Sequence, residues 1–407
     1  MQFIANKLYN TKSKDKRNAS LPAITIATAG VALGIAIMLI SIAIVVGFKR
    51  EVGQKLTGFA TSIEILNIHS LQLPEANPII IPSYLQQRIQ ELDNVAHTQR
   101  VSQKMGVLKT NEHFSAITLK GIDRDYDTTH LHSLLIDGRI PTPSADTASG
   151  EILISQQIAR EHSLKVGDKV YAYFFEQNIK TRRFNIVGIY ESHLKQFDST
   201  FAITDRFTVG RLNNWIKEQF SELEIQLVPT AQIEPTQAQI QNLVKGFPNL
   251  SVINVREHYP QVFSWLEMLD LNTWVILILM LGVAIFTMTS GTLIIILEHT
   301  PTIGLLVALG ASKKQLRKIF LILATRIMLK GIVIGNVVGI TLLLILKYTD
   351  FITLDPETYY VKHIPISITS QHWLSINIAT SFIILITLLV PTLAISRIQP
   401  SKSIKFD

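Results

Sequence analysis

The chain contains no cysteine among its 407 residues. This absence excludes disulfide bonds, catalysis by a thiolate and metal sites built from cysteine. Any domain exposed to an oxidising compartment must therefore be held together by its own hydrophobic core. A stretch of about 200 residues is large enough to bury such a core.

Recognisable catalytic motifs are also missing. The chain has no Gly-x-Ser-x-Gly and no His-Glu-x-x-His sequence, which would indicate a hydrolase nucleophile or a zinc site. His130 and His132 form a pair without further ligands nearby, which is typical of surface residues. The segment from Gly304 to Lys313 lacks the spacing and the preceding strand of a phosphate-binding loop. We therefore predict a non-catalytic chain that binds no metal, nucleotide or other cofactor itself.

Charged residues are absent from four long apolar runs. These runs are 18–48, 271–297, 331–346 and 373–396. A helix needs roughly 20 apolar residues to cross a bilayer, and inside lipid every backbone polar group must be paired within the segment. The alternative, one soluble α/β domain, would have to hide uncharged runs of this length in its core. The pattern predicts a membrane protein with four transmembrane helices.

Positive charge is concentrated beside these runs, and the net charge is +7. The Lys and Arg residues lie before the first and third runs and after the last: Lys7, Lys12, Lys14, Lys16, Arg17, Lys313, Lys314, Arg317, Lys318, Arg397, Lys402 and Lys405. Juxtamembrane Lys and Arg mark the cytoplasmic side. Both termini are therefore predicted to be cytoplasmic. Membrane topology explains the charge better than nucleic-acid binding does, so no nucleic-acid partner is expected.

The predicted fold class is an integral membrane α-helical protein with a large mixed α+β periplasmic domain inserted between the first and second of its four helices (one plus three). The predicted segments, in chain order, are a cytoplasmic N-terminal segment 1–20, transmembrane helix 21–48, external domain 49–270, transmembrane helix 271–297, two cytoplasmic helices within 298–326, transmembrane helix 327–347, external loop 348–372, transmembrane helix 373–396 and cytoplasmic tail 397–407. The first run is too long for a secretory signal and lacks a cleavage site, so we expect an uncleaved anchor.

Three local expectations concern element boundaries. Arg326 and Lys330 lie just before the third run, so the crossing is predicted to start near Ile327, after an interfacial helix over 313–326 and with Lys330 at the cytoplasmic surface. A helix that begins at Glu257 is expected to run on into the second span. Within 49–270, short strands alternate with short helices, Ser155 is a predicted N-cap, and two subdomains are expected to meet near the turn-rich stretch 141–150.

The most informative local segment lies between the second and third runs. Pro301 suits the first turn of a short helix, Leu305, Leu306 and Leu309 are expected on one face, and Gly310 can end it. Such a helix at the cytoplasmic surface either docks in a partner's groove or is a simple connection. The candidate docking residues are Glu298, Thr300, Pro301, Ile303, Gly304, Leu305, Leu309, Gly310, Ala311 and Ser312.

Glycines recur at intervals of four residues in two of the runs. They are Gly30 and Gly34 in the first run, and Gly331, Gly335 and Gly339 in the third. Small residues at this spacing let helices approach closely in lipid. Packing within one bundle is the favoured interpretation, with dimerisation as the alternative.

The segment Glu298–Ser312 resembles the coupling helix of type VII ABC permeases, the superfamily of the macrolide exporters. The closest branch is the lipoprotein-releasing (Lol-type) permeases, on short stretches whose order and spacing agree over essentially the whole chain. They are Phe3-Ile4-Ala5, Gly30-Val31-Ala32-Leu33-Gly34, Gly47-Phe48, Gly150–Ser155, Val166-Gly167-Asp168, Val187–Ser192, Phe197-Asp198, Tyr359-Tyr360 and Ile364-Pro365-Ile366.

The resemblance implies a permease in the inner membrane of a Gram-negative bacterium. It implies as partners a separate ATPase subunit bound at the coupling helix, a second permease copy or paralogue, lipoprotein cargo and a periplasmic carrier. In the family, the carrier is recruited by an extended hairpin before the Val-Gly-Ile strand. Here the hairpin is the short 175–182, with Glu176, Gln177, Asn178 and Ile179 as its candidate carrier-facing residues and no proline-bracketed projection. This departure puts carrier docking by this chain in doubt.

Two alternatives share the architecture. Efflux permeases for small molecules or peptides fit the four-helix pattern, and permeases of the cell-division type signal across the membrane without moving cargo. The size of the 49–270 domain favours transport over signalling, because division-type relatives have a smaller external domain. The periplasmic stretches that carry the resemblance favour lipoprotein release over efflux.

Overall fold

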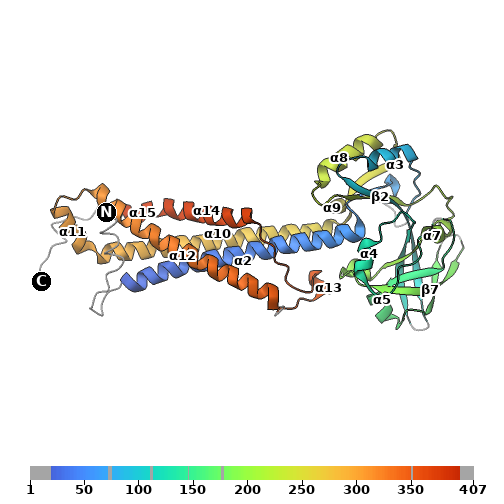
Figure 1. Ribbon diagram of the computed structural model, residues 1–407, viewed down its shortest axis with the longest axis horizontal. Coiled ribbons are helices and arrows are strands. Elements are labelled where there is room, and N and C mark those ends of the chain that lie inside the picture. The colour runs from blue at the N-terminus through green and yellow to red at the C-terminus, as the bar shows by residue number, and fades with distance from the viewer. Residues whose placement is uncertain are drawn as a thin grey trace. The chain divides into compact units, whose positions relative to one another are not determined.

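The computed structural model describes residues 20–71, 76–110, 113–144, 146–175, 178–349 and 352–394. The predicted N-terminal segment 1–20 (apart from Ser20), the tail 397–407, and the candidate residues Glu176 and Gln177 lie outside the described residues. The chain forms two compact units (Figure 1). The helical unit comprises residues up to Arg50, Trp265–Thr353 and the chain from His363 onward, and the α/β unit comprises Glu51–Ser264 and Leu354–Lys362.

The helical unit is built from long apolar helices. Its elements are α2 (Ser20–Ala60, whose last turns belong to the α/β unit), α10 (Pro260–Glu298), α11 (Thr300–Ala308), α12 (Lys313–Thr349), α14 (Ser370–Thr387) and α15 (Leu389–Ala394). Four helical stretches among the described residues are long and apolar enough to cross a membrane: Pro22–Ala60, Pro260–Glu298, Lys313–Thr349 and Ser370–Thr392. Their length and composition fit the four predicted spans.

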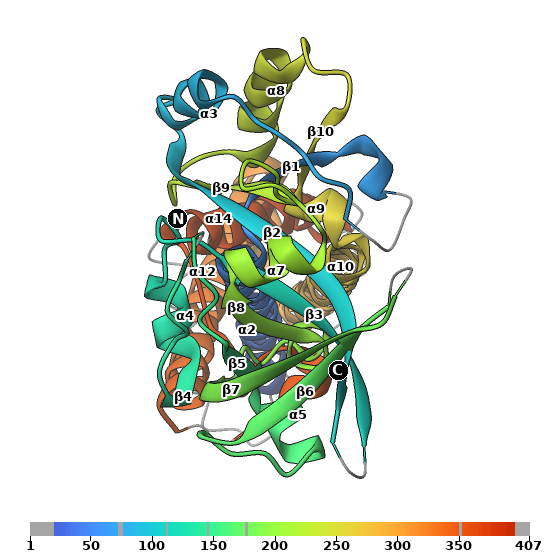
Figure 2. The ribbon, with the colours of Figure 1, turned by 90° about the vertical axis from the view of Figure 1, so that its right-hand side faces the viewer.

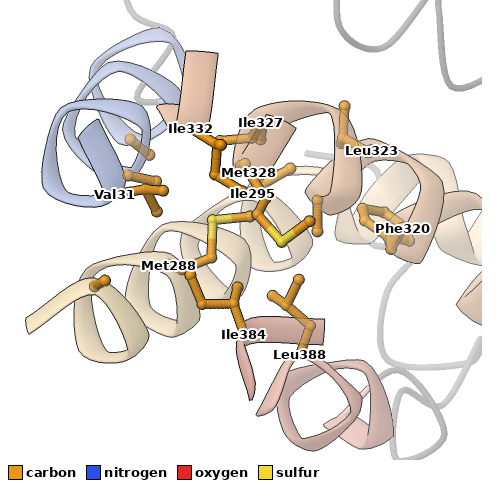
Figure 3. Close-up of a cluster of buried hydrophobic side chains, with 14 of the residues drawn as sticks. Val31, Met288, Ile295, Phe320, Leu323, Ile327, Met328, Ile332, Ile384 and Leu388 are labelled. Atoms are coloured by element: carbon orange, nitrogen blue, oxygen red, sulfur yellow. The ribbon is translucent and has the colours of Figure 1, made fainter. Parts of the chain in front are cut away.

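Side chains from these helices meet in a buried apolar cluster (Figure 3). Val31 comes from α2, Met288 from α10, Met328 from α12 and Ile384 from α14. Many large apolar side chains of the same helices stay exposed on the outside, among them Phe286 and Phe382. A helix that is apolar all round fits a lipid environment, because lipid tails do not drive such side chains inward.

Two predicted helix boundaries in or next to this unit are wrong. α12 continues without a break from Lys313 to Thr349, so this described stretch holds no separate interfacial helix that ends before Ile327. The segment 313–330 contains neither Gly nor Pro and is rich in strong helix formers, so nothing in its local sequence ends the helix. Conversely, no single helix runs from Glu257 into the second span. Tyr259 has φ −119° and ψ 58°, because a residue before proline is disfavoured in the helical conformation.

The α/β unit contains a ten-stranded sheet (Figure 2). Nine strands run in the order β10-β1-β9-β2-β3-β8-β5-β7-β4, and β6 pairs with β2 and β7. Most neighbours are antiparallel, while β3 with β8 and β5 with β7 are parallel. The strands are β1 (Ile63–Asn67), β2 (Val95–Lys109), β3 (Phe114–Ile122), β4 (Leu135–Gly138), β5 (Glu151–Ser155), β6 (Lys169–Phe174), β7 (Lys180–Tyr190), β8 (Phe201–Asp205), β9 (Glu222–Leu227) and β10 (Leu250–Asn254).

The α/β unit also contains short helices, and two apolar cores are buried within it. The helices are η1 (Ile68–Leu71), α3 (Ser83–Gln90), α4 (Thr129–Leu134), α5 (Gln156–Glu161), α6 (Lys195–Asp198), α7 (Arg206–Leu212), α8 (Ile233–Val244), α9 (Val255–His258) and α13 (Pro356–Tyr359). One core gathers residues from Ile63 to Val95 and from Phe220 to Val252, and the other gathers residues from Leu108 to Leu212.

The residues of the second core lie in the chain between the two segments that form the first core. Strand β2 contributes to both, with Val95 in the first core and Leu108 in the second. The predicted boundary near 141–150 is wrong, because residues on both sides of that stretch belong to one core. Locally the expectations hold better. The Ser155 hydroxyl accepts a hydrogen bond from the Ile158 N–H at 3.0 Å, as expected for an N-cap.

Candidate functional site

The helix α11 forms the middle of the predicted coupling segment 298–312. Pro301 lies in its first turn, where a missing N–H costs no intrahelical hydrogen bond. At its other end, Gly310 has φ +92°, a conformation that glycine adopts without a steric penalty. The Gly310 N–H donates to Val307 O at 3.0 Å and the Ala311 N–H to Leu306 O at 2.9 Å. This pair of bonds is the Schellman arrangement that ends a helix.

One face of α11 is buried against the helical unit. Ile303 is 1% exposed and Gly304 is also buried, while Leu306 and Val307 pack against the apolar cluster of Figure 3. These contacts fix the short helix to the larger bundle. They also correct one expectation, because Leu306 is turned toward the bundle and does not share a face with Leu305 and Leu309.

The opposite face of α11 is open and apolar. Leu305 is 56% exposed and Leu309 is 76% exposed, one helical turn apart. The chain then turns through Gly310 into α12, where Ser312 and Gln315 form a reciprocal cap: the Ser312 N–H donates to Gln315 Oε1 at 2.9 Å and the Gln315 N–H to Ser312 Oγ at 3.3 Å. A rigid helix thus presents two exposed leucines next to a capped basic helix start.

Polar groups at the start of this segment have local partners or are buried. Thr300 does not cap α11, since the N-cap position is His299, and its hydroxyl donates to Ile296 O at 3.2 Å. Glu298, at the end of α10, has its Oε2 atom buried with no hydrogen-bond partner among the described residues.

The repeated glycines lie at close helix–helix contacts. A Cβ added at Gly30 would lie 2.3 Å from Thr287 Oγ1 of α10, and one at Gly34 would lie 3.3 Å from Met280 O. On α12, a Cβ at Gly331 would lie 2.8 Å from Val31 Cβ of α2, one at Gly335 would lie 2.6 Å from Ala32 O, and one at Gly339 would lie 3.2 Å from Ala36 Cα. Helix α2 therefore packs closely on both α10 and α12 within one chain.

The candidate carrier-facing hairpin joins β6 to β7. Ile179 is 66% exposed and Asn178 is also exposed, while Phe175 beside them is 55% exposed. The strand that follows is anchored, because Lys180 Nζ donates to Leu212 O and to Asn214 Oδ1, both at 2.7 Å.

A polar contact between α12 and α14 has no counterpart among the sequence-based expectations. Asn336 Nδ2 donates to Asn377 Oδ1 at 2.7 Å, and Trp373 Nε1 donates to Asn336 Oδ1 at 2.6 Å. Side-chain amides that bond across helices stabilise helix pairs in lipid. From the sequence alone, Asn336 in an apolar run could equally have faced a lipid headgroup. Only the structure shows that it pairs with Asn377, 41 positions away.

A mostly apolar cavity of about 440 Å³ lies between α2, α10 and α14. Met38, Leu277 and Ile376 contribute to its walls, and Asp270 and His372 are among its few ionisable lining residues. Asp270 is also 2.5 Å from Lys49 Nζ. Another pocket, of about 360 Å³ and with both polar and apolar lining residues, lies within the α/β unit and includes Glu222 and His258.

Comparison with known proteins places both regions of the chain. Residues 24–243 match the family model of the MacB-like periplasmic core domain, and residues 274–400 match that of the FtsX-like permease C-terminal region. The first match alone covers more than half of the chain.

Full-length relatives have the same extent. The chain is 21% identical over 398 residues to the lipoprotein-releasing system transmembrane protein LolE of Haemophilus influenzae, with 92% of each chain covered. It is 21% identical over 414 residues to LolC of Xylella fastidiosa and 20% identical over 427 residues to LolC of Neisseria meningitidis, with 96% of each chain covered in both cases.

Solved structures with similarity include the periplasmic region of MacB from Actinobacillus actinomycetemcomitans, at 12% identity and a TM-score of 0.35, which covers 49% of this chain and 92% of that one. The extracellular domain of the transporter YknZ from Gram-positive bacteria, at 17% identity and a TM-score of 0.33, covers 47% of this chain and all of that one. On the family models and the full-length relatives, the chain belongs to the permeases that combine a MacB-like periplasmic core domain with an FtsX-like C-terminal region, and within them it is a Lol-type ABC permease of type VII.

Proposed function

We propose that this chain is the permease subunit of an ABC transporter that extracts lipoproteins from the inner membrane toward the outer membrane. The observation that carries the proposal is α11, whose buried face fixes it to the bundle while Leu305 and Leu309 stay exposed for a partner. The energy comes from ATP hydrolysed by a separate subunit. The extent of the match to relatives named as lipoprotein-releasing supports the choice of cargo.

The proposal includes a membrane topology. All four apolar helices cross the bilayer, one before the α/β unit and three after it, with the α/β unit in the periplasm and both termini in the cytoplasm. Lys313, Lys314 and Lys318 at the start of α12 are exposed, and Lys and Arg next to a span favour the cytoplasmic side, which supports this orientation. A second permease, either a copy or a paralogue, completes the membrane part, and a periplasmic carrier receives the cargo.

Depletion of the protein in its own bacterium tests the function. We expect lipoproteins destined for the outer membrane to accumulate in the inner membrane, measured by fractionation and immunoblotting, and we expect their release to a carrier from spheroplasts to stop. Normal sorting with chained cells would instead support division control. Normal sorting with increased sensitivity to macrolides would support efflux.

A purification experiment tests the power source. Isolation of the tagged chain in mild detergent is expected to recover an ATPase subunit in stoichiometric amount. Recovery of the permease alone, under conditions in which the complex of a known relative stays intact, would contradict the assignment of α11 as its docking site.

A further inference from the structure

Two long helices join neighbouring strands of the sheet in the α/β unit. α2 ends at Ala60 and leads into β1, while β10 leads through α9 to Pro260, the first residue of α10. β1 and β10 are antiparallel neighbours with Ile63 opposite Asn254, and Figure 2 shows α9 at their end. The Val255 N–H donates to Ser62 O at 3.1 Å. The two junctions between helix and strand are therefore bonded directly to each other.

A buried lysine holds the end of α2. Lys120 of β3 is 3% exposed, and its Nζ lies 2.6 Å from Glu224 Oε1 of β9 and 3.2 Å from Phe59 O in the last turn of α2. The last four carbonyls of a helix have no partner within it, and they form the negative end of its dipole. The ammonium of Lys120 thus ties the end of α2 to two strands of the sheet.

A second ion pair, whose imidazole is 36% exposed and whose carboxylate is 6% exposed, holds the segment that leads into α10. His258 of α9 places its Nδ1 2.6 Å from Glu64 Oε2 of β1. Burial disfavours the imidazolium, but the Glu64 carboxylate outweighs it and raises the pKa of His258 to about 9. The start of α9 is fixed as well, because Asn254 and Glu257 form a capping box.

Aromatic rings connect the end of α2 to the start of α10. The Phe197 ring lies 4.7 Å from that of Phe59 in α2 and 5.3 Å from that of Tyr259, the residue between α9 and α10. Tyr259 also stacks on His258 at 4.6 Å. A displacement of either helix end therefore meets packed side chains that contact the other.

We propose that Lys120 is a positioning residue of the transport cycle, which locks the end of α2 to the sheet so that movements of α2 and α10 reach the α/β unit as one rigid displacement. This inference rests on the proposed function for its role in transport. A buried ion pair is often no more stable than an apolar pair of similar size. This pair instead fixes the position of the helix end, because the one ammonium contacts both Glu224 of β9 and the carbonyl of Phe59 in α2.

The absence of cysteine allows a direct test. Spin labels are attached to Gln54→Cys on α2 and Asn185→Cys on β7, both exposed and both within the α/β unit, and pulsed EPR on the full chain in detergent measures the distribution of distances between them. The test variant is Lys120→Met with Glu224→Gln, which removes the clamp without leaving a buried charge unpaired and keeps an acceptor for Gln99. The control is Lys217→Met with Asp146→Asn, an exposed ion pair of 2.6 Å.

We expect the distance distribution to become roughly twice as wide in the Lys120 variant and to stay unchanged in the control, because loss of the clamp allows local opening. Lys120→Arg, which keeps a cation, should restore the narrow distribution. If the double variant does not fold, Lys120→Gln, which removes the ammonium but keeps a polar side chain beside Glu224, provides the same test. A narrow distribution in whichever variant folds would overturn the proposal.

A functional measurement separates this proposal from the proposed function. In membranes containing the partner ATPase, the Lys120 variant should hydrolyse ATP at the unaltered rate while lipoprotein release falls by at least about tenfold. Undiminished release would overturn the role in transport. If the unaltered chain itself releases no lipoprotein, the proposed function fails, whereas the EPR result still decides whether Lys120 holds α2.

Discussion

At the scale of single residues, Glu222 is a buried carboxyl surrounded by other carboxyls in the α/β unit. Its carboxyl lies on β9, is 6% exposed and accepts a hydrogen bond from Gln103 Nε2 at 2.6 Å. Burial, together with the nearby carboxylates of Glu64 and Glu224, raises its pKa to about 8, while Lys120 and His258 act in the opposite direction. The native protein therefore holds a proton at Glu222 at neutral pH.

This proton makes stability depend on pH. The unfolded chain loses it near pH 4.5, the ordinary value, so between about 4.5 and about 8 the native state binds more protons and stability falls as pH rises. His258, with its pKa raised from 6.5 to about 9, further lowers the stability as the pH rises between these two values. Glu222→Gln should flatten the slope below pH 8 and make the chain more stable than the unaltered one at pH 8, by on the order of a few kcal/mol.

The measurement is the unfolding midpoint of the full chain in detergent at several pH values between about 5 and about 9, the window that these pKa values define. Glu218→Gln, at an exposed position, is the control and should leave the slope unchanged. Parallel curves for Glu222→Gln and the unaltered chain would show that the Glu222 carboxyl is ionised in the native state.

Ser163 offers a simpler test of backbone strain. It follows α5 with φ +53° and is exposed. The left-handed conformation costs an L-residue roughly 1–2 kcal/mol and costs glycine almost nothing. Ser163→Gly should therefore raise the free energy of unfolding by about 0.5–1 kcal/mol, after the greater freedom of glycine in the unfolded chain is subtracted. Ser163→Ala keeps the strain and should give no gain, and equal stability of the two variants would contradict this account.

The buried charged residues of the α/β unit could not be predicted from the sequence. Lys120 and Glu224 are charged residues on strands 104 positions apart, and charged strand residues usually face solvent. Only the pairing of β1, β2 and β9 brings Glu64, Glu222 and Glu224 into one buried network with Lys120 of β3. Such a network depends on sheet order, which local pattern does not encode.

At the scale of elements, sequence signals worked where local chemistry decides. Pro301 and Gly310 predicted a short helix between the second and third runs, and α11 runs from Thr300 to Ala308. The prediction that Leu306 shares a face with Leu305 and Leu309 was wrong, because Leu306 packs against the buried cluster of the helical unit. The prediction of an interfacial helix separate from the third span was also wrong. It rested on the charges of Arg326 and Lys330, but a charge limits how deep a residue lies in the membrane and does not end a helix.

The glycines of α12 allow a graded prediction about helix packing. A Cβ at Gly335 meets Ala32 O of α2 at 2.6 Å, whereas one at Gly339 finds its nearest atom at 3.2 Å. Gly335→Ala should lower the stability of the helical unit by about 1–3 kcal/mol through overpacking. Gly339→Ala meets less resistance and gains up to about 1 kcal/mol of helix propensity, so its net effect should be smaller.

Unfolding in mixed detergent micelles, followed by circular dichroism, measures both variants. Gly282→Ala on α10, where a Cβ has open space, is the matched control and should be neutral or slightly stabilising. A loss at Gly339 equal to or larger than that at Gly335 would contradict the packing seen between α2 and α12.

At the scale of the whole molecule, the order of apolar runs and the coupling segment predicted the family, and the family models over 24–243 and 274–400 confirm it. The sequence could do this because four uncharged runs and a helix with fixed end signals are local features. The order of the ten strands in one sheet, and the division of the α/β unit into two cores, depend on contacts between distant residues. No local pattern predicted the strand order or the two cores.

The coupling role of α11 yields the last prediction. Leu309 is 76% exposed and Leu305 is 56% exposed, so a carboxylate at either position is solvated in the free chain and leaves the fold intact. In a partner's groove the same carboxylate would be buried without a counter-ion. Leu309→Glu and Leu305→Glu should each weaken binding of the ATPase subunit at least about tenfold, which corresponds to about 1.4 kcal/mol. Gly304 is not a suitable position, because it is buried against the bundle and a side chain there would disturb the helix itself.

Ile216→Glu is the matched control, since Ile216 is an apolar residue of the α/β unit with 60% exposure and no part in the proposed docking. Co-purification of the ATPase subunit and stimulation of its activity in proteoliposomes measure the effect, with unfolding midpoints to verify that each variant is folded. The control should retain both properties, and both leucine variants should lose both. Full ATPase binding by Leu305→Glu and Leu309→Glu would mean that the partner does not contact this face of α11, and the power source would then have to be sought elsewhere on the cytoplasmic surface.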